Sequence, residues 1–215
     1  MNTPATYSAD YFERGKELGL SCYENYRWLP ALTVPMVRAL IAGLGIRKTD
    51  TILDFGCAKG YVVKAFRMLG YNAKGCDISE YAVDCADEAT REHLCLLGAD
   101  RKLPSCGAEA WDWIICKDVL EHLTHDEIAF TLAEFYSGAL NVCAVVPLGD
   151  ALGERFVIEE MEHDVTHVTR ENLAWWRSQF YLRGFAKVST AYQMRGIKEN
   201  WTDAYPLGNG FIIAS

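Results

Sequence analysis

The sequence lacks long apolar runs. No stretch approaches the ~20 consecutive apolar residues that a membrane-spanning helix needs. The first 15 residues also lack the basic start and the apolar segment of a secretory signal peptide. We therefore expect a cytoplasmic protein with no membrane partner.

Positive charge is also scarce. The chain has 21 Lys and Arg residues against 29 Asp and Glu residues, which gives a formal net charge of -8. Proteins that bind the phosphates of DNA or RNA carry a basic face. The composition therefore argues against nucleic acid as a partner.

Cysteine is present but never in C-x-x-C spacing. None of the eight cysteines has a partner three positions away, which argues against a zinc site or a thioredoxin-like motif. Several lie within apolar runs, such as WDWIICKD at 111–118. We expect free, buried thiols.

The apolar pattern switches repeatedly between helix and strand periods. With 215 residues, 50% of them hydrophobic, the chain can form one sizeable core. The pattern predicts helices at 31–45, 61–70, 80–94 and 126–139, strands at 51–55, 72–79, 111–118 and 141–149, then a helix at 169–184 and strands at 186–194 and 210–215. Such alternation predicts parallel strands with crossover helices on both faces.

We expect a single domain in three parts. Residues 1–30 are rich in tyrosine and charge and show no core pattern, so we interpret them as an arm over the active site. Residues 31–150 form the predicted cofactor-binding core. Residues 151–215 form an insert on the acceptor side and the closing strands.

The stretch ILDFGCAKGYVVKAF at 52–66 reads as a buried strand, a glycine turn and a helix. A dinucleotide site needs G-x-G-x-x-G, but the corresponding residues are Gly56, Ala58 and Tyr61. A tyrosine at the third position would prevent the close approach of helix and strand. The pattern present is D-x-G-x-x-x-G, with Asp54 and Gly60, and it disfavours an NAD-binding oxidoreductase.

Asp77 follows the second predicted strand. A carboxylate at this point can accept hydrogen bonds from two ribose hydroxyls, while the helix N-terminus after the glycine turn offers free N–H groups. The two features together indicate a nucleoside cofactor.

Four segments in order resemble the motifs of class I S-adenosylmethionine-dependent methyltransferases. They are LDFGCAKG, GCDIS, LGADRKLP and WDWIICKDVLEHL, and the resemblance spans about 46–150. It implies a Rossmann-like α/β sandwich of three layers, in which a seven-stranded, mostly parallel sheet has an antiparallel last strand. It also implies transfer of the cofactor's methyl group to an acceptor.

The resemblance assigns the glycine turn to the methionine half of S-adenosylmethionine. Gly56, Ala58 and Gly60 would form the loop around it, and Asp54 would support that loop. Ala58 departs from the pattern, because many members have glycine there. A small residue should still fit.

The other cofactor contacts follow from the later motifs. By the same resemblance, Asp77 and Ile78 bind the ribose and flank the adenine. Asp100 faces the adenine amino group, with Arg101 beside it, and Lys117 borders the reactive end.

The segment KDVLEHLTHDE at 117–127 suggests a metal as a less favoured alternative. If Asp118 starts a helix, then Asp118, Glu121 and His122 share one face and can bind a divalent cation. This set resembles the E-x-x-E-H motif of metal-assisted methyltransferases for ubiquinone precursors or small-RNA ends, which also use a later histidine, here His163 or His167. The other interpretation is that His122 is only a polar wall or a base.

Two histidines are the candidate catalytic residues. A hydroxyl acceptor must lose a proton, and an imidazole is suited to accept it. We select His122 and His167, although His167 could equally anchor its loop.

The N-terminal YENYRWLP is the candidate acceptor-binding segment. Aromatic rings at this density often close a pocket, although they could instead cover the sheet edge. An arginine could pair with a phosphate or carboxylate of the acceptor. The selected residues are Tyr23, Tyr26, Arg27 and Trp28.

The sequence thus predicts O-methylation of a small molecule, with a sugar or sugar-phosphate conjugate as the first candidate. One alternative is a metal-assisted O-methyltransferase of quinone-type phenols, and another is a non-catalytic module that binds the cofactor. We expect a monomer or a homodimer.

Overall fold

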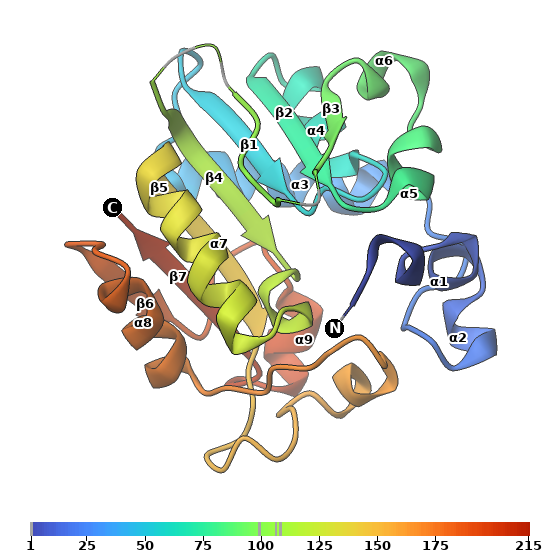
Figure 1. Ribbon diagram of the computed structural model, residues 1–215, viewed down its shortest axis with the longest axis vertical. Helices are drawn as coiled ribbons and strands as arrows, with labels where there is room; N and C mark the ends of the chain where they lie inside the picture. The colour runs from blue at the N-terminus through green and yellow to red at the C-terminus, as the bar shows by residue number, and fades with distance from the viewer. Residues whose placement is uncertain (1, 99, 106, 108) are drawn as a thin grey trace.

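A seven-stranded sheet forms the centre of the computed structural model, which describes residues 2–98, 100–105, 107 and 109–215 (Figure 1). The strands, in their order across the sheet, are β3 (Leu94–Leu96), β2 (Asn72–Asp77), β1 (Thr51–Phe55), β4 (Trp111–Lys117), β5 (Ala139–Pro147), β7 (Asn209–Ala214) and β6 (Val188–Ala191). All neighbours are parallel except those of β7, which is antiparallel to both β5 and β6. The predicted fold class is confirmed.

Helices cover both faces of the sheet. In chain order they are α1 (Ala9–Glu13), α2 (Gly15–Leu18), α3 (Pro30–Leu44), α4 (Tyr61–Met68), α5 (Glu80–Asp84), α6 (Glu88–Arg91), α7 (His125–Gly138), α8 (Leu173–Leu182) and α9 (Glu199–Ala204). Helices α7 and α8 pack on one face and α3 and α4 on the other, so that the sheet lies between two apolar clusters (Figure 1).

Successive residues of the central strands alternate between these two clusters. In β1, Ile52 packs toward α3 and α4, whereas Leu53 packs toward α7 and α8. In β4, Ile114 and Ile115 divide in the same way. A strand buried on both faces needs apolar residues at every position. This explains the continuous apolar runs in the sequence.

The single helix predicted for 80–94 is wrong. The chain forms α5 and α6 and then β3, which pairs in parallel with β2. The side chain of Asp87 accepts a hydrogen bond from the Thr90 N–H at 3.2 Å, so it caps α6 and separates the two helices.

Two further boundaries differ from the prediction. Helix α8 begins at Leu173 instead of 169, because the Asn172 side chain accepts from the Trp175 N–H at 3.0 Å and caps the helix there. The strand predicted at 186–194 covers only Val188–Ala191, and α9 was not predicted.

The N-terminal arm has a core of its own, contrary to the sequence interpretation. Tyr11 and Phe12 of α1 are 3% and 4% exposed, and they pack with Ala82 of α5. Helix α1 of the arm therefore packs against α5.

The described cysteines are free, and Cys57, Cys76, Cys116 and Cys143 are buried as expected. Cys22 and Cys85 are exposed instead. Cys106 lies outside the described residues. None of the helices that the structure describes has the length and apolar character for crossing a membrane.

The apolar contact between α7 and the sheet can be tested at Phe135. This fully buried ring lies 5.0 Å from that of Phe55, in an edge-to-face arrangement. We expect Phe135→Ala to lower the free energy of unfolding by about 3–5 kcal/mol, measured by urea denaturation, because it leaves a cavity. Phe130→Ala is the matched control on the same helix, since Phe130 is 43% exposed and should change stability by less than about 1 kcal/mol. Equal effects of the two substitutions would contradict the packing described.

Candidate active site

A cavity opens where the carboxyl ends of β1, β2 and β4 meet, and the empty space in it and at its open mouth is about 700 Å³. Its walls come from the loops after these strands on one side and from the N-terminal arm on the other. The carboxyl edge of a parallel sheet is the usual place for a ligand in an open α/β fold.

The loop after β1 lines the cavity with backbone rather than side chains. Gly56 has φ of 75°, and a Cβ there would lie 2.4 Å from a Val119 methyl group. Gly60 has φ of 73° and lies against Leu94. Ala58 also has a positive φ, 48°, which explains why glycine is favoured at this middle position. Alanine nevertheless adopts this backbone conformation here.

Asp77 at the end of β2 fixes this loop. Its Oδ2 accepts a hydrogen bond from the Ala58 N–H at 2.7 Å, and its Oδ1 accepts one from the Ser79 N–H at 2.8 Å. Burial raises the pKa of Asp77, while these backbone donors act in the opposite direction. A carboxylate has about four acceptor positions. About two therefore remain for the hydroxyls of a ligand.

Asp54 lies beneath the loop and is 4% exposed. Burial raises its pKa to about 7, although the nearby Lys117 ammonium acts against this shift. Neither side chain belongs to the cavity lining. Asp54 and Lys117 can therefore act on a ligand through their charge but not by direct contact.

Two lysines hold Asp118 at the end of β4. The Lys117 and Lys198 ammonium groups each lie 2.5 Å from one of its carboxylate oxygens. Burial opposes ionisation of Asp118, but these two cations hold its pKa well below the usual range. Lys198 also donates to the Asn209 side-chain oxygen at 3.0 Å. Sequence reasoning missed Lys198, because it lies 80 residues away in a polar segment without a motif.

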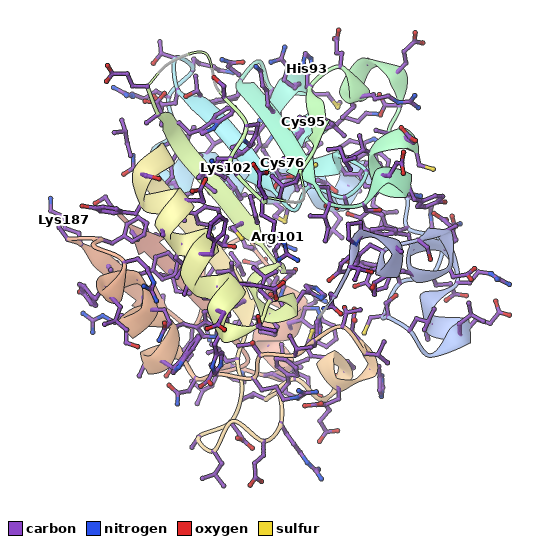
Figure 2. All side chains as sticks on the ribbon, viewed as in Figure 1. Cys76, His93, Cys95, Arg101, Lys102 and Lys187 are labelled. Carbon is purple, nitrogen blue, oxygen red and sulfur yellow. The ribbon has the colours of Figure 1, made fainter. Side chains whose placement is uncertain are left out.

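The loop after β3 brings Arg101, but not Asp100, to the cavity. Arg101 lines it near the tip of β4 and pairs with Glu127 at 2.9 Å (Figure 2). Asp100 is exposed, and its carboxylate accepts from the Lys102 N–H at 3.4 Å. Ile78 lines the cavity, together with Leu97, which the sequence reasoning did not select.

The N-terminal arm forms the aromatic wall. Tyr7, Tyr11, Phe12 and Tyr23 line the cavity, and only Tyr23 of these was selected from the sequence. The repeated aromatics of YSADYFERG were the signal available for the others. The Ser79 hydroxyl donates to the Tyr7 carbonyl at 2.6 Å and so ties the arm to the end of β2.

The other predicted acceptor residues lie outside the lining. Tyr26 and Trp28 pack beside Tyr61, with ring centroids 5.2 Å and 5.8 Å from it. Arg27 is exposed and donates to the Asn25 carbonyl at 3.3 Å.

A second ion pair fixes the arm to the glycine turn. The Lys59 ammonium, 7% exposed as a residue, lies 2.5 Å from a Glu13 carboxylate oxygen. It also donates to the Tyr26 carbonyl at 2.9 Å. The Tyr81 hydroxyl donates to the same Glu13 oxygen at 3.0 Å. The arm and the turn therefore form one unit.

The residue cluster next to the aromatic wall differs from the predicted metal set. Glu121, His122 and His167 each offer one ligand atom, and these atoms lie within 4.8 Å of one another. Asp118 is not in this group, and the condition that it starts a helix is not met. Asp118 has φ of 56°, and the chain continues as a 3₁₀ turn, Leu120–His122. His163 is exposed.

Burial shifts the titration of all three clustered residues. It lowers the pKa of His122 to about 4, and the His167 imidazole, whose ring centroid lies 4.6 Å from that of His122, lowers this pKa further. Burial likewise lowers the pKa of His167. It raises the pKa of Glu121 well above its ordinary value, and the Asp118 carboxylate raises it further. His122 lines the cavity, whereas the other two residues lie behind it.

Comparison with known proteins supports the assignment of this architecture. A family model described as a methyltransferase domain matches residues 35–189. A comparison with curated proteins found no match.

Solved structures share the fold at low sequence identity. An S-adenosylmethionine-dependent methyltransferase from Archaeoglobus fulgidus has a TM-score of 0.65 and 17% identity over 86% of this chain and 96% of its own. The magnesium protoporphyrin IX methyltransferase of Synechocystis, solved with S-adenosylhomocysteine, has a TM-score of 0.58 and 20% identity over 85% of this chain and 81% of its own. Human N-acetylserotonin methyltransferase, solved with S-adenosylmethionine, has a TM-score of 0.59 and 16% identity over 83% of this chain and 50% of its own.

The family model covers more than half of the chain, and it includes the strand ends and loops that form the cavity floor. The strand order, with β7 antiparallel between β5 and β6, is the fold of these enzymes. The chain therefore belongs to the class I S-adenosylmethionine-dependent methyltransferases.

Proposed function

We propose that this chain transfers the methyl group of S-adenosylmethionine to an oxygen atom of a small acceptor molecule. One observation carries the proposal: a single cavity has a floor suited to a nucleoside and a wall of tyrosine side chains beside His122. The cofactor would occupy the first part and the acceptor the second.

The cofactor half is built from backbone and one carboxylate. Two acceptor positions of Asp77 suit the two ribose hydroxyls, and the apolar Ile78 and Leu97 suit the faces of an adenine. Gly56 and Ala58 leave room for the methionine half along the loop. The predicted contact from Asp100 to the adenine amino group needs movement of its exposed side chain.

The acceptor half suits an uncharged molecule. Tyr7, Tyr11 and Tyr23 offer flat rings against which a sugar or a phenol can pack. Arg101 is the cation among the described lining residues, and Glu127 already neutralises it. Arg27, the reason for expecting a phosphate, faces solvent. These observations favour a neutral hydroxyl compound over a sugar phosphate.

The reaction would be an in-line displacement. The bond from the acceptor oxygen to the methyl carbon forms while the carbon–sulfur bond breaks, S-adenosylhomocysteine leaves as a neutral thioether, and the hydroxyl proton is released to solvent. Alignment of the two reactants supplies most of the acceleration that such a site can give. We assign the contact with the acceptor hydroxyl to His122, the clustered residue that lines the cavity, with His167 directly behind it.

Release of S-adenosylhomocysteine tests the proposed function. The assay uses S-adenosylmethionine with three acceptor groups: neutral sugars, sugar phosphates and phenols. We expect turnover with a neutral hydroxyl compound and little with its phosphorylated counterpart. Tight binding of the cofactor without turnover on any group would favour a non-catalytic module, and binding of NAD in its place would contradict the cofactor assignment.

Asp77→Ala tests the cofactor site. The substitution removes the ribose acceptor and also the anchor of the Ala58 N–H, so calorimetry should show binding of S-adenosylhomocysteine weakened by about 1–3 kcal/mol. Asp10→Ala is the control, since this carboxylate is exposed and pairs with Arg14 on the surface. Unchanged affinity of the Asp77 variant would contradict the assigned ribose contact.

Asp54 should couple cofactor binding to proton release. With a pKa of about 7, it is about half protonated at neutral pH before the cofactor binds. The ammonium group of the cofactor favours the charged carboxylate, so binding lowers this pKa and releases up to about half a proton. Calorimetry at pH 7 in buffers of different ionisation enthalpy should therefore give different heats.

The matched variant is Asp54→Asn, which keeps the shape and removes the titration. Its binding heats should no longer depend on the buffer in this way. Identical heats for the original chain in every buffer would contradict the predicted coupling.

A further inference from the structure

We propose that Glu121, His122 and His167 bind one divalent transition cation at the acceptor end of the cavity. Its role toward the acceptor rests on the proposed function, but cation binding itself can be measured without any acceptor. Three independent observations lead to this site: a buried carboxylate without hydrogen-bond partners, the fixed tautomers of two imidazoles, and their distances.

The carboxylate of Glu121 has no hydrogen-bond partner among the described residues. Its side chain is fully buried, and neither oxygen accepts a hydrogen bond there. Its backbone, by contrast, is well paired, because the carbonyl accepts from the N–H groups of Val168 and Thr169 at 2.9 Å and 3.1 Å. Buried carboxylates in proteins are normally paired or coordinated to a metal. A carboxyl group without such partners, held in a turn whose backbone is well paired, is a candidate metal ligand.

His167 presents a free lone pair to this carboxylate. Its Nδ1 lies 2.7 Å from the carbonyl oxygen of Met161, and a carbonyl can only accept. The proton is therefore on Nδ1, and Nε2 carries the lone pair. Asp164 approaches Nε2 only to 3.9 Å, which is too long for a hydrogen bond.

His122 is fixed in the same tautomer through a longer chain. Its Nδ1 lies 2.7 Å from the Thr166 hydroxyl, which itself donates to Asp164 Oδ1 at 2.5 Å. The hydroxyl proton is thus already used, so the hydroxyl accepts from Nδ1. The Tyr11 hydroxyl donates to the other oxygen of Asp164 at 2.7 Å and holds that carboxylate in place. Nε2 of His122 is left with its lone pair.

The three donor atoms are close enough for one cation. Ligand atoms about 2.0–2.2 Å from a tetrahedral metal ion lie about 3.3–3.6 Å from one another. One ligand atom of each of the three residues lies within 4.8 Å of those of the other two, so binding of one cation requires the side chains to move together by at most about 1.5 Å. Imidazoles held through their other nitrogen are the usual arrangement in metal sites.

Neighbouring charges do not block the site. The Lys198 ammonium group acts electrostatically on both Glu121 and His167, but it is paired with Asp118 and Asn209. Asp118 is likewise held by its two lysines and is not available as a ligand.

The donor set indicates the kind of cation. Two imidazoles and one carboxylate suit Zn²⁺, Co²⁺ or Mn²⁺ rather than Mg²⁺ or Ca²⁺, which prefer oxygen ligands. Three protein ligands leave at least one position open. Because His122 lines the cavity, that position would face the acceptor. With the cation bound, His122 would act toward the acceptor through the cation instead of by direct contact, and the cation would bind the hydroxyl oxygen and help its proton pass to water before methyl transfer.

Titration of metal-stripped protein with Zn²⁺ and Co²⁺ tests the site. We expect one Zn²⁺ per chain by calorimetry, a visible Co²⁺ absorption band of a low-coordinate site, and much weaker binding of Mg²⁺. Glu121→Gln and His167→Asn should each weaken Zn²⁺ binding at least tenfold, and Thr166→Val, which frees the His122 tautomer, by about 10–100-fold.

His163→Asn is the matched control, because this imidazole lies in the same segment but is exposed. It should bind Zn²⁺ as the original chain does. Circular dichroism and S-adenosylhomocysteine affinity are measured on every sample, so that loss of folding is recognised. Thr166→Val is a second variant, at a residue that is not itself a proposed ligand.

The absence of stoichiometric Zn²⁺ or Co²⁺ binding would overturn the proposal, and so would equal binding by Glu121→Gln and the original chain. Loss of binding in the His163 variant would place the ion elsewhere. Failure of these tests with S-adenosylhomocysteine still bound overturns the metal site alone, whereas failure of S-adenosylhomocysteine binding concerns the proposed function.

Discussion

The active site depends on the hydrogen bonds that the Asp77 carboxylate accepts. This carboxylate accepts the Ala58 N–H from the loop after β1 and the Ser79 N–H from its own strand end, and so holds two neighbouring strand ends in one arrangement. Ala58 is in the left-handed region, a conformation that costs free energy for any residue other than glycine and that this hydrogen bond helps to hold. The same carboxylate keeps free acceptor positions toward the cavity. Formation of the turn and binding of a nucleoside therefore rely on one group.

The second requirement is that the N-terminal arm stays closed over this floor. The ion pair of Lys59 and Glu13 joins the glycine turn to α1, and Tyr11 joins α1 to Asp164 in the segment before α8. Asp164 in turn orders Thr166 and, through it, His122. The aromatic wall, the histidine cluster and the cofactor loop are thus linked by hydrogen bonds among segments far apart in the sequence. Opening of the arm would disturb all three.

The fold and the cofactor loop could be predicted from the sequence because their causes are local. Strands buried on both faces need apolar runs, and the turn after β1 needs Gly56 where a side chain would meet Val119. Strand β3 could not be predicted, because three residues that follow a helical segment carry too little of the alternating strand pattern. The acceptor side depends on long-range contacts: Lys198 reaches Asp118 across 80 residues, and Thr166 reaches His122 across 44. No local pattern distinguishes these partners from Arg27, whose aromatic neighbours suggested a pocket but which faces solvent.

An experimental structure of the chain with S-adenosylhomocysteine bound tests this account most directly. We predict the ribose hydroxyls on the Asp77 carboxylate, the adenine between Ile78 and Leu97, and the sulfur directed toward His122 and the tyrosines of the arm. A ligand bound away from Asp77, or with its sulfur facing away from the arm, would contradict the division of the cavity into a cofactor half and an acceptor half.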